Sequence, residues 1–536
     1  MEQSGTGRRS GQNFIAGAAV LSVAGVLVKI VSACFKIPLT NLLGAQAMSY
    51  FNTAYTVYNL LVNLSTVGLS VAVARCIAEY AALGRTEEER VVVSVANRTF
   101  GLIGLALGLV FFLLADPIAA ALQNPGAAPA CRALSPALLF VALLSVNKGF
   151  FQGHGDMVPL AVSNLIEVLV KLVAGLGISW LLLQNGMDSP SVVGGAVAGV
   201  SLGAFFSMLY LFVRKLLAAP RGPRLPRKEA RVRGVWQKFV RTALPVTLGA
   251  LTGNLAGLID LGLVMRRLVS SGMSVDGANT LYGAYSAMSL TVFNMPLAIV
   301  LSVGVAALPA VSAAAALRDS EKTRRTVSAA LKLTSLFSLP CAVGMSALSG
   351  PILRLLFTRA EEVPLAETPL AILGVAFFFM GMASVATPLL QALGRPWAPV
   401  RNLLLAAAVK IACNFWLVPL YRLEGAAFSN LMMYLALCAL NLLSLRRATG
   451  GRPEWGRSFF RPLAAALLCA AAAWGAQALL ARLIPESIAT LLAVLLGAAV
   501  YLAAVLVFRV LRAEDLAFLP KSKKIKKILE KKGWIG

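Results

Sequence analysis

Charged residues, and acidic ones above all, are scarce in this 536-residue chain. They make up 13% of it, whereas a soluble domain carries roughly a quarter. The chain has 23 Asp and Glu, 49 Lys and Arg, and one histidine. Because 58% of the residues are hydrophobic, a water-soluble core could not bury them all. This composition excludes a soluble enzyme.

Motifs for catalysis and for cofactor binding are also missing from the sequence. The seven cysteines follow no metal-ligand or disulfide spacing, and the lone histidine, His154, stands in a short glycine-containing turn. No Gly-rich loop is followed by Lys-Ser or Lys-Thr. The longest external connection between apolar runs covers residues 350–368. We therefore expect no metal, no cofactor and no enzymatic activity.

Long apolar runs recur along the whole chain. Each is close to the ~20 residues that a helix needs to cross the hydrocarbon layer of a membrane. The runs predict an all-α integral membrane protein of about fourteen transmembrane helices. The predicted spans are 13–36, 50–74, 92–115, 132–152, 158–183, 191–213, 241–265, 281–307, 328–349, 368–393, 398–420, 424–445, 460–482 and 487–509.

The excess of basic residues follows membrane topology. If the first helix starts in the cytoplasm, 37 of the 49 Lys and Arg fall in cytoplasmic segments or at the cytoplasmic ends of spans, eight at external ends and four well inside spans. Cytoplasmic loops of membrane proteins carry such an excess. The net charge of +26 therefore indicates a multi-pass membrane protein with both termini in the cytoplasm, and no nucleic-acid partner is expected.

The longest polar stretch inside the chain separates two groups of spans. Residues 214–241 contain ten Lys and Arg and three prolines, a composition typical of a linker. We expect an N-terminal six-helix bundle in residues 1–213, a basic cytoplasmic linker in 214–240, a second six-helix bundle in 241–447, two additional helices in 448–512 and a polybasic cytoplasmic tail in 513–536.

The two bundles share a sequence repeat. The segment QGHGDMVPLAVSNLIEVLVKL, which starts at Gln152, aligns without gaps on QALGRPWAPVRNLLLAAAVKI, which starts at Gln391. This alignment places Lys171 opposite Lys410. Repeats of this length indicate duplicated structural units.

A second match at the same offset supports the duplication. The offset of 239 residues also aligns Gly44–Ala45 with Gly283–Ala284. It spans six helices, an even number of crossings, so corresponding helices run in the same direction. We therefore predict two parallel six-helix repeats, with a transport path between them, plus two C-terminal helices.

Four lysines lie well inside predicted spans, where a charge costs at least ~2.5–3.5 kcal/mol and normally faces a cavity or a partner; they are Lys29, Lys171, Lys332 and Lys410. Lys29 and Lys36 are two turns apart on one face of the first predicted helix, so both could line one wall of a cavity. Reaching the membrane surface is the alternative for Lys36. Lys332 stands near a cytoplasmic end and is expected to reach that surface.

The carboxylates near the other intramembrane cations are few. Glu167 and Lys171 are one helical turn apart, so they either neutralise each other or line a functional cavity. Lys410 has no glutamate at the equivalent position and must find another partner or face water. Asp260 could pair with Arg266 at the mouth of the cavity.

Positive charge exceeds negative charge in this predicted central region. Such an excess indicates a path for an anion, and a phosphate-bearing substrate would fit it. A cation-coupled drug or Na⁺/H⁺ antiporter would instead use lone intramembrane carboxylates, and the first predicted helix has none. The sign of these charges is the best discriminator between the two classes.

One segment resembles a known family. The segment KGFFQGHGDMVPLAVSNLIEVLVKL, from Lys148 to Leu172, is similar to the basic-Gly-aromatic-Phe-Gln-Gly turn, Met-x-Pro and intramembrane Glu of SpoVB/MurJ-type flippases. Its motif-turn residues are Gln152 and Gly153, with Gln391 in the repeat. The resemblance covers essentially the whole chain.

What the resemblance implies is the MATE-like fold of the multidrug/oligosaccharidyl-lipid/polysaccharide (MOP) exporter superfamily, with a V-shaped cavity. It also implies flipping of an undecaprenyl-pyrophosphate-linked saccharide across a bacterial plasma membrane. Lipid II for peptidoglycan is the leading candidate, and spore cortex or other polysaccharides are alternatives. The coupling ion is not indicated.

The sequence departs from this family at its expected arginines. MurJ-type proteins are expected to carry arginines in the first helix and another in the second, but this chain has lysines in the first and asparagines in the second. Lysine keeps the charge and lacks the guanidinium fork. The candidate substrate-binding residues are Lys29, Lys36, Asn59, Asn63, Glu167, Lys171, Asp260, Arg266 and Lys410.

The polybasic tail has its own expected partner. KSKKIKKILEKKGWIG contains seven lysines, with Ile525, Ile528 and Leu529 at helical spacing. It is predicted to lie on the anionic lipids of the cytoplasmic leaflet.

Three functions remain open on the sequence alone. A lipid-linked saccharide flippase is favoured, and a cation-coupled MATE-type multidrug exporter is the alternative. A membrane-embedded glycosyltransferase or ligase would need a large external loop with convergent carboxylates, which the short external connections do not provide.

Overall fold

The computed structural model describes residues 24–508 except 26, 29, 219–254, 318 and 451–458. The predicted first span, 13–36, and seventh span, 241–265, therefore lie partly outside the described residues. The predicted tail, 513–536, and most of the predicted linker lie outside them altogether. Every regular element within the described ranges is a helix.

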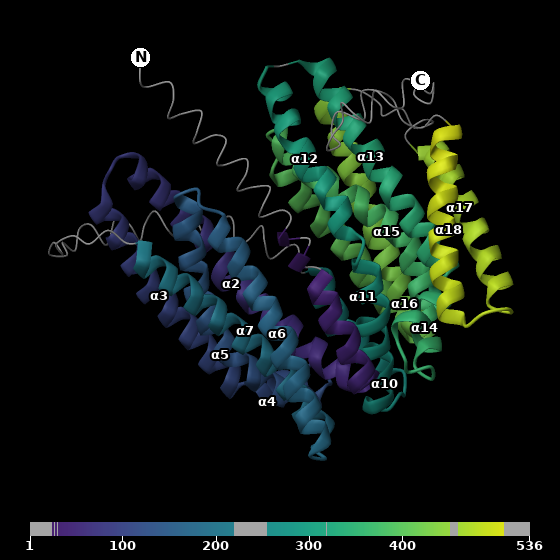
Figure 1. Cartoon of the computed structure of the whole chain (residues 1–536), viewed down its shortest axis with the longest axis horizontal. Coiled ribbons are helices and arrows are strands. Elements are labelled where there is room, and N and C mark those ends of the chain that lie inside the picture. Colours follow the sequence, from purple (N-terminus) through teal and green to yellow (C-terminus); the bar gives the residue numbers. More distant parts are fainter. Residues whose placement is uncertain are drawn as a thin grey trace. The chain divides into compact units, whose positions relative to one another are not determined.

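The first part of the described chain is a series of helices (Figure 1), most of which are apolar enough to cross a membrane. A helix at Ile30–Leu43 ends at Gly44, whose φ of +81° is a value that favours glycine. One glycine therefore makes the connection where the predicted spans left a longer loop. The elements that follow are α2 (Ala45–Ala82), α3 (Thr86–Leu113), α4 (Ala115–Ala121), the short 3₁₀ helix η1 (Pro125–Ala127), α5 (Ala128–Gly153), α6 (Val158–Gln184) and α7 (Ser189–Ala218).

The second part of the described chain begins after residue 254. Its elements are α9 (Leu255–Ser270), α10 (Val275–Gly283), the π-helical segment η2 (Ala284–Ser289), α11 (Leu290–Asn294), α12 (Leu297–Ala316), α13 (Ser320–Ala347), α14 (Ser349–Leu356), α15 (Val363–Ala392), α16 (Trp397–Thr449), α17 (Arg461–Leu480) and α18 (Glu486–Val507).

These helices form two compact units. The first contains the described residues up to 266 together with 274–283, and the second contains 267–273 and the described residues from 284 onward. The eighth predicted span is thus shared, because α10 belongs to the first unit while η2, α11 and α12 belong to the second.

The number of membrane-spanning helices depends on how two bent elements are counted. Ten described helices are long and apolar enough to cross a membrane, or eleven if the bent α10–α12 segment is one span. One of the ten, α16, has 53 residues, far more than the ~30 Å hydrocarbon core requires. It breaks at Arg422, where φ is 48° and ψ is −120°, and therefore consists of two helices. The total of fourteen stays a prediction.

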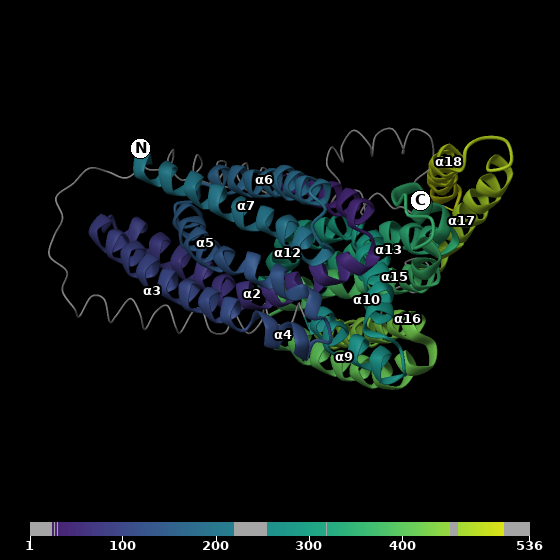
Figure 2. The same ribbon diagram turned by 90° about the horizontal axis from the view of Figure 1, so that it is seen from below.

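Glycines bring α6 and α7 unusually close together in the first unit, where the two helices run side by side (Figure 2). A Cβ on Gly199 of α7 would lie 2.4 Å from the backbone nitrogen of Gly175 on α6. A Cβ on Gly203 would lie 2.5 Å from the carbonyl oxygen of Glu167. The small residues allow this backbone contact, which fixes the position of the helix that carries Glu167.

We expect Gly199→Ala to destabilise the protein, because the added methyl group overlaps the backbone of α6. Overpacking of this kind costs about 1–3 kcal/mol. The matched control is Gly177→Ala on α6, where no atom outside the glycine's own helix lies within 4 Å of the new Cβ. Thermal unfolding of the two purified variants in detergent is the measurement, and equal melting temperatures would contradict this view of the helix contact.

The predicted repeat is visible in the turns after α5 and α15. Gly155 and Gly394, which are 239 residues apart, have φ values of +75° and +74°. The amide of Gly155 donates to the carbonyl of Gln152 over 3.1 Å, and that of Gly394 donates to Gln391 over 3.0 Å. In both turns, the amide of the residue after the glycine donates to the carbonyl five residues earlier over 3.0 Å. The same backbone turn therefore joins corresponding helices, as the alignment predicts.

The two C-terminal helices pack within the second unit (Figure 1). Tyr501 of α18 donates a hydrogen bond to the carbonyl of Leu336 on α13 over 2.7 Å. Arg354 of α14 pairs with Glu486 at the start of α18 at 2.7 Å, and with Glu367 of α15 at 3.5 Å. One arginine thus ties three helices together.

Candidate functional site

A cavity of about 230 Å³ lies inside the first unit. Its walls come from the first apolar helix and from α2, α5, α6 and α7. Five lining residues are valines, and the polar ones are Ser32, Tyr55, Tyr58, Asn59, Glu167 and Lys171. A mostly apolar wall with a few convergent polar groups is typical of a ligand site. Asn59, Glu167 and Lys171 were predicted from the sequence.

One face of α2 provides the aromatic wall. Tyr55, Tyr58 and Asn59 share this face because they are three and four residues apart. The rings of Phe51 and Tyr55 are stacked with centroids 5.5 Å apart, and those of Tyr55 and Tyr58 are 5.8 Å apart. Asn63, also predicted, instead donates its side-chain N–H to the carbonyl of Asn59 over 2.8 Å and does not line the cavity.

Aromatic groups surround the ammonium of Lys171. Its Nζ lies 3.4 Å from the hydroxyl oxygen of Tyr55, and 4.9 and 4.8 Å from the ring centroids of Phe35 and Tyr55. Ring faces attract a cation at such distances. Within the described part of the chain, no carboxylate lies within ion-pair distance of this ammonium.

Of the two alternatives for Glu167 and Lys171, mutual neutralisation is therefore wrong, and both side chains line the cavity instead. The Oε2 of Glu167 lies 3.5 Å from the Nζ of Lys148 on α5. The spacing along α6 allowed a pair within the helix, but the rings hold Lys171 while Lys148 reaches Glu167 from the neighbouring helix. From the sequence, Lys148 was assigned only as the first residue of the family motif and counted with the cytoplasmic residues. It lies close to the cytoplasmic end of the predicted span 132–152, near enough for its side chain to reach back to Glu167.

The remaining charge of the cavity region is positive. Lys148 offsets Glu167, whereas Lys171 has the half-buried Lys36 of the first apolar helix close enough to feel its charge. Two ammonium groups in one low-dielectric region repel each other and attract an anion. Lys29 lies outside the described residues.

Asp260 and Arg266 of α9 do not form the predicted pair. Among the described residues, Arg266 donates to the carbonyl of Ala121 over 3.2 Å, and the neighbouring Arg267 places its guanidinium 3.4 Å from the ring centroid of Phe415. Asp260 is buried inside the first unit. The two arginines follow it by more than one turn, and each finds a nearer partner.

Lys410 lies in a separate polar cluster inside the second unit. It is fully buried on the first arm of α16, and its Nζ donates to Oδ1 of Asn430 on the second arm over 2.8 Å. Asn430 in turn donates to the hydroxyl of Tyr285 on η2. The repeat mates Lys171 and Lys410 thus differ, because the first lines a cavity and the second joins three segments of a packed core.

Lys332 of α13 is also buried, with 7% of its surface exposed. The prediction that it reaches the membrane surface is therefore wrong. The prediction was based on the position of Lys332 near the end of a helix. In the structure, α13 packs against α12, α15 and α17, and the side chain is covered.

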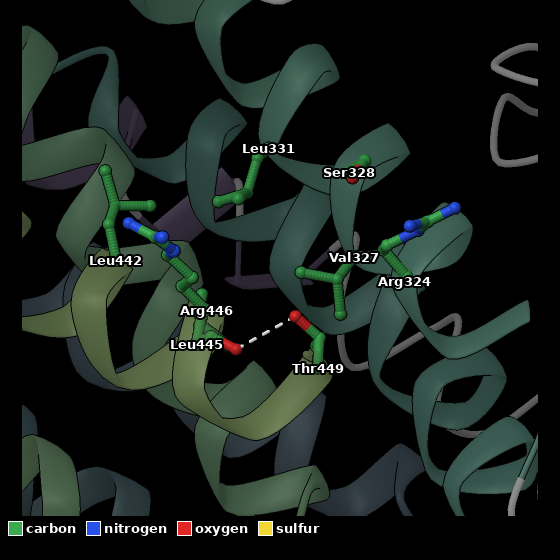
Figure 3. A pocket seen from close by; sticks show the side chains of 8 residues that line it. All are labelled: Arg324, Val327, Ser328, Leu331, Leu442, Leu445, Arg446 and Thr449. Carbon is green, nitrogen blue, oxygen red and sulfur yellow. Dashed lines mark hydrogen bonds between the residues drawn. The ribbon is translucent and has the colours of Figure 1, made fainter. Parts of the chain in front are cut away.

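A second hollow lies between the ends of α13 and α16 (Figure 3). It encloses about 10 Å³, about the space of a single water molecule. The guanidinium groups of Arg324 and Arg446 point away from each other in Figure 3. This hollow therefore lacks the geometry of an anion clamp.

The motif turn lies apart from the cavity. Gln152 and Gln391 have exposed side chains. Gly153 permits close packing, because a Cβ there would lie 2.7 Å from the carbonyl oxygen of Ala74 on α2. The motif thus serves the turn and the contact between α5 and α2. Within the described residues, no cluster of three His, Cys, Asp or Glu could hold a metal.

Comparison with known proteins decides the class of transporter. The family model described as "Lipid II flippase MurJ" matches residues 40–496, which is most of the chain. The chain belongs to the MurJ lipid II flippase family. MurJ proteins are transporters rather than enzymes, and they are multi-pass proteins of the bacterial cell membrane. The predicted resemblance is confirmed.

Curated relatives cover nearly the full length of this MurJ-family chain. It is 24% identical over 528 residues to the "Uncharacterized membrane protein YabM" of Bacillus subtilis (strain 168), with 96% of each chain covered. It is 22% identical over 519 residues to "Stage V sporulation protein B" of the same organism, with 95% of this chain and 98% of the relative covered.

Solved structures of MurJ and MATE transporters share the fold. The lipid II flippase MurJ in its inward closed conformation matches with a TM-score of 0.71 at 16% identity, covering 91% of this chain and 98% of the other. An inward-facing MATE transporter of the MOP superfamily matches with a TM-score of 0.63 at 15% identity, covering 79% and 95%. The predicted all-α, MATE-like fold class is confirmed.

Proposed function

We propose that this MurJ-family protein moves an undecaprenyl-pyrophosphate-linked saccharide, a lipid II-like peptidoglycan precursor, from the cytoplasmic to the outer leaflet. The observation that carries the proposal is Lys171, a cation in a cavity wall that no described carboxylate neutralises. The pyrophosphate of the substrate supplies the missing negative charge.

The surroundings of Lys171 suit the binding of a phosphate group. Its ammonium has three donors, and the one contact with Tyr55 leaves the others for a ligand. Hydrogen bonds between an ammonium and a phosphate are charge-assisted and stronger than neutral ones. The valine-rich wall strengthens this attraction further, because it lowers the local dielectric.

We infer that transport proceeds by alternating access, with α10 as a detachable part of the external gate. In the first unit, α10 packs on the start of α2. The hydroxyl of Ser49 donates to Oδ1 of Asn279 over 2.8 Å in a buried contact. Gln46 donates to Asp276 over 3.0 Å. Such hydrogen bonds contribute a net of about 0.5–1.5 kcal/mol each, because water can replace them when α10 separates from α2.

The backbone beside α10 supports a hinge at that point. The boundary between the compact units falls between Gly283 and Ala284, where the π-helical segment η2 begins. Short π-helical segments are frequent at functional sites. A Cβ at Gly283 would lie 1.7 Å from the carbonyl oxygen of Ala45, so only glycine permits this docking.

The remaining parts of the proposal follow from the distribution of charge. The excess of Lys and Arg in alternate connections supports a cytoplasmic location for both termini. The polybasic tail, 513–536, then lies on anionic lipids of the cytoplasmic leaflet. The two bundles, 1–213 and 241–447, act as the two moving parts.

The proposal is tested in bacteria depleted of their own lipid II flippase. We expect expression of this chain to restore growth and the exposure of lipid II on the outer leaflet. Growth without restored lipid II exposure would contradict the proposed substrate. Extrusion of cationic drugs in the same cells, without rescue of growth, would favour a multidrug exporter instead. Membrane levels of the chain, measured by immunoblot, are the control.

A further inference from the structure

We propose that the cavity in the first unit holds the sugar ring next to the phosphate of the lipid-linked substrate, and that Tyr58, Asn59 and Glu167 select for that sugar. This inference rests on the proposed function. It assigns separate roles within the cavity: Lys171 binds the phosphate, and the other three side chains bind the sugar.

The carboxylate in the wall is the first argument for a sugar. One oxygen of Glu167 pairs with Lys148 at 3.5 Å, and its other oxygen accepts no hydrogen bond from the described residues. A carboxylate can only accept hydrogen bonds. An ionised phosphate has no proton to donate to this oxygen, yet the carboxylate lines the same cavity as Lys171. A ligand that carries neutral donors, such as hydroxyl or amide groups, beside its anionic group fits both side chains.

Two further polar groups have no partner. Within the described residues, the hydroxyl of Tyr58 and the side-chain amide of Asn59 make no hydrogen bond. Tyr58 is 5% exposed. It lines the cavity, so a ligand group that forms a hydrogen bond with its hydroxyl gains about 0.5–1.5 kcal/mol. A phenol hydroxyl and an amide each donate and accept, which matches the hydroxyl groups of a sugar.

The size of the cavity limits what it can take. Pockets for drug-sized ligands measure roughly 300–1,000 Å³, and this cavity is smaller at about 230 Å³. It therefore suits one ring-sized group rather than a disaccharide with its peptide. The ring directly attached to the phosphate is the one that can reach Tyr58 and Asn59 while Lys171 holds the phosphate.

Binding of two lipids to the purified full-length chain in nanodiscs tests this assignment. One lipid is undecaprenyl pyrophosphate, and the other is lipid II, the same carrier with its saccharide. The variants are Tyr58→Phe, Asn59→Ala and Lys171→Met. The matched controls outside the cavity are Tyr421→Phe on α16 and Asn185→Ala after α6, both at exposed positions.

We expect Tyr58→Phe and Asn59→Ala each to raise the Kd for lipid II by about 3- to 10-fold, the effect of one lost hydrogen bond, and to leave the Kd for undecaprenyl pyrophosphate unchanged. We expect Lys171→Met to weaken both lipids. If Tyr58→Phe and Asn59→Ala affect both lipids equally, or neither, the sugar assignment is overturned. If Lys171→Met affects neither lipid, the proposed function itself fails.

Discussion

Replacing Lys171 with methionine should lower transport of the lipid-linked saccharide by about 10- to 100-fold, the range expected for one lost hydrogen bond to a charged group. Methionine keeps the length and apolar contacts of the side chain but removes the ammonium that Tyr55 and two ring faces position. The measurement is the rate at which lipid II becomes accessible on the outer leaflet of depleted cells that express the variant.

Two companion variants separate loss of charge from loss of folding. Lys171→Arg keeps the charge and should retain most of the activity. Lys322→Met makes the same exchange at an exposed position at the start of α13 and should change nothing. Full transport by Lys171→Met at a normal membrane level would show that the cationic cavity is not on the transport path.

Joining α10 to α2 by a disulfide should stop transport. The side chains of Ser49 and Asn279 are in contact, with 2.8 Å between Oγ and Oδ1, so cysteines at both positions bring two thiols near each other, and formation of the disulfide is verified directly by its mobility on a non-reducing gel. After oxidation, we expect transport to fall to background because α10 can no longer leave α2. Reduction of the disulfide should restore it.

The single variants Ser49→Cys and Asn279→Cys are the controls, each assayed with and without oxidant. They are needed because the chain has seven native cysteines, of which Cys34 is exposed. The two single variants should keep their activity in oxidant. An oxidised double variant that is fully cross-linked and still active would contradict the proposed gate.

Much of the fold could be predicted because the position of a membrane helix is determined by a local run of apolar residues. Apolar runs specify helices, and the shared offset of 239 residues predicted that Gly155 and Gly394 occupy equivalent turns, which their φ values confirm. The break at Arg422 inside α16 also falls between two predicted spans. The short connection at Gly44 was not predicted. A single glycine with a positive φ joins the two helices there, and hydropathy does not change at that point in the sequence.

The candidate site was predicted only in part, because partners between helices depend on packing. Spacing placed Glu167 one turn from Lys171, but it could not show that Lys148 of α5 is the partner of Glu167. Tyr55 and Tyr58 were not predicted, because a tyrosine inside an apolar run has no local pattern that distinguishes a cavity wall from any other position on the helix. The burial of Lys410 against Asn430 likewise depends on how the two arms of α16 meet.

Translocation by the purified chain in proteoliposomes tests the central claim most directly. Fluorescent lipid II is placed in the membrane, and its loss to a membrane-impermeant quencher reports movement between leaflets. Our account predicts that vesicles with the natural chain expose lipid II far faster than protein-free vesicles or vesicles with the Lys171→Met variant. Equal rates for the natural chain and for Lys171→Met would contradict the claim that this cavity carries the substrate.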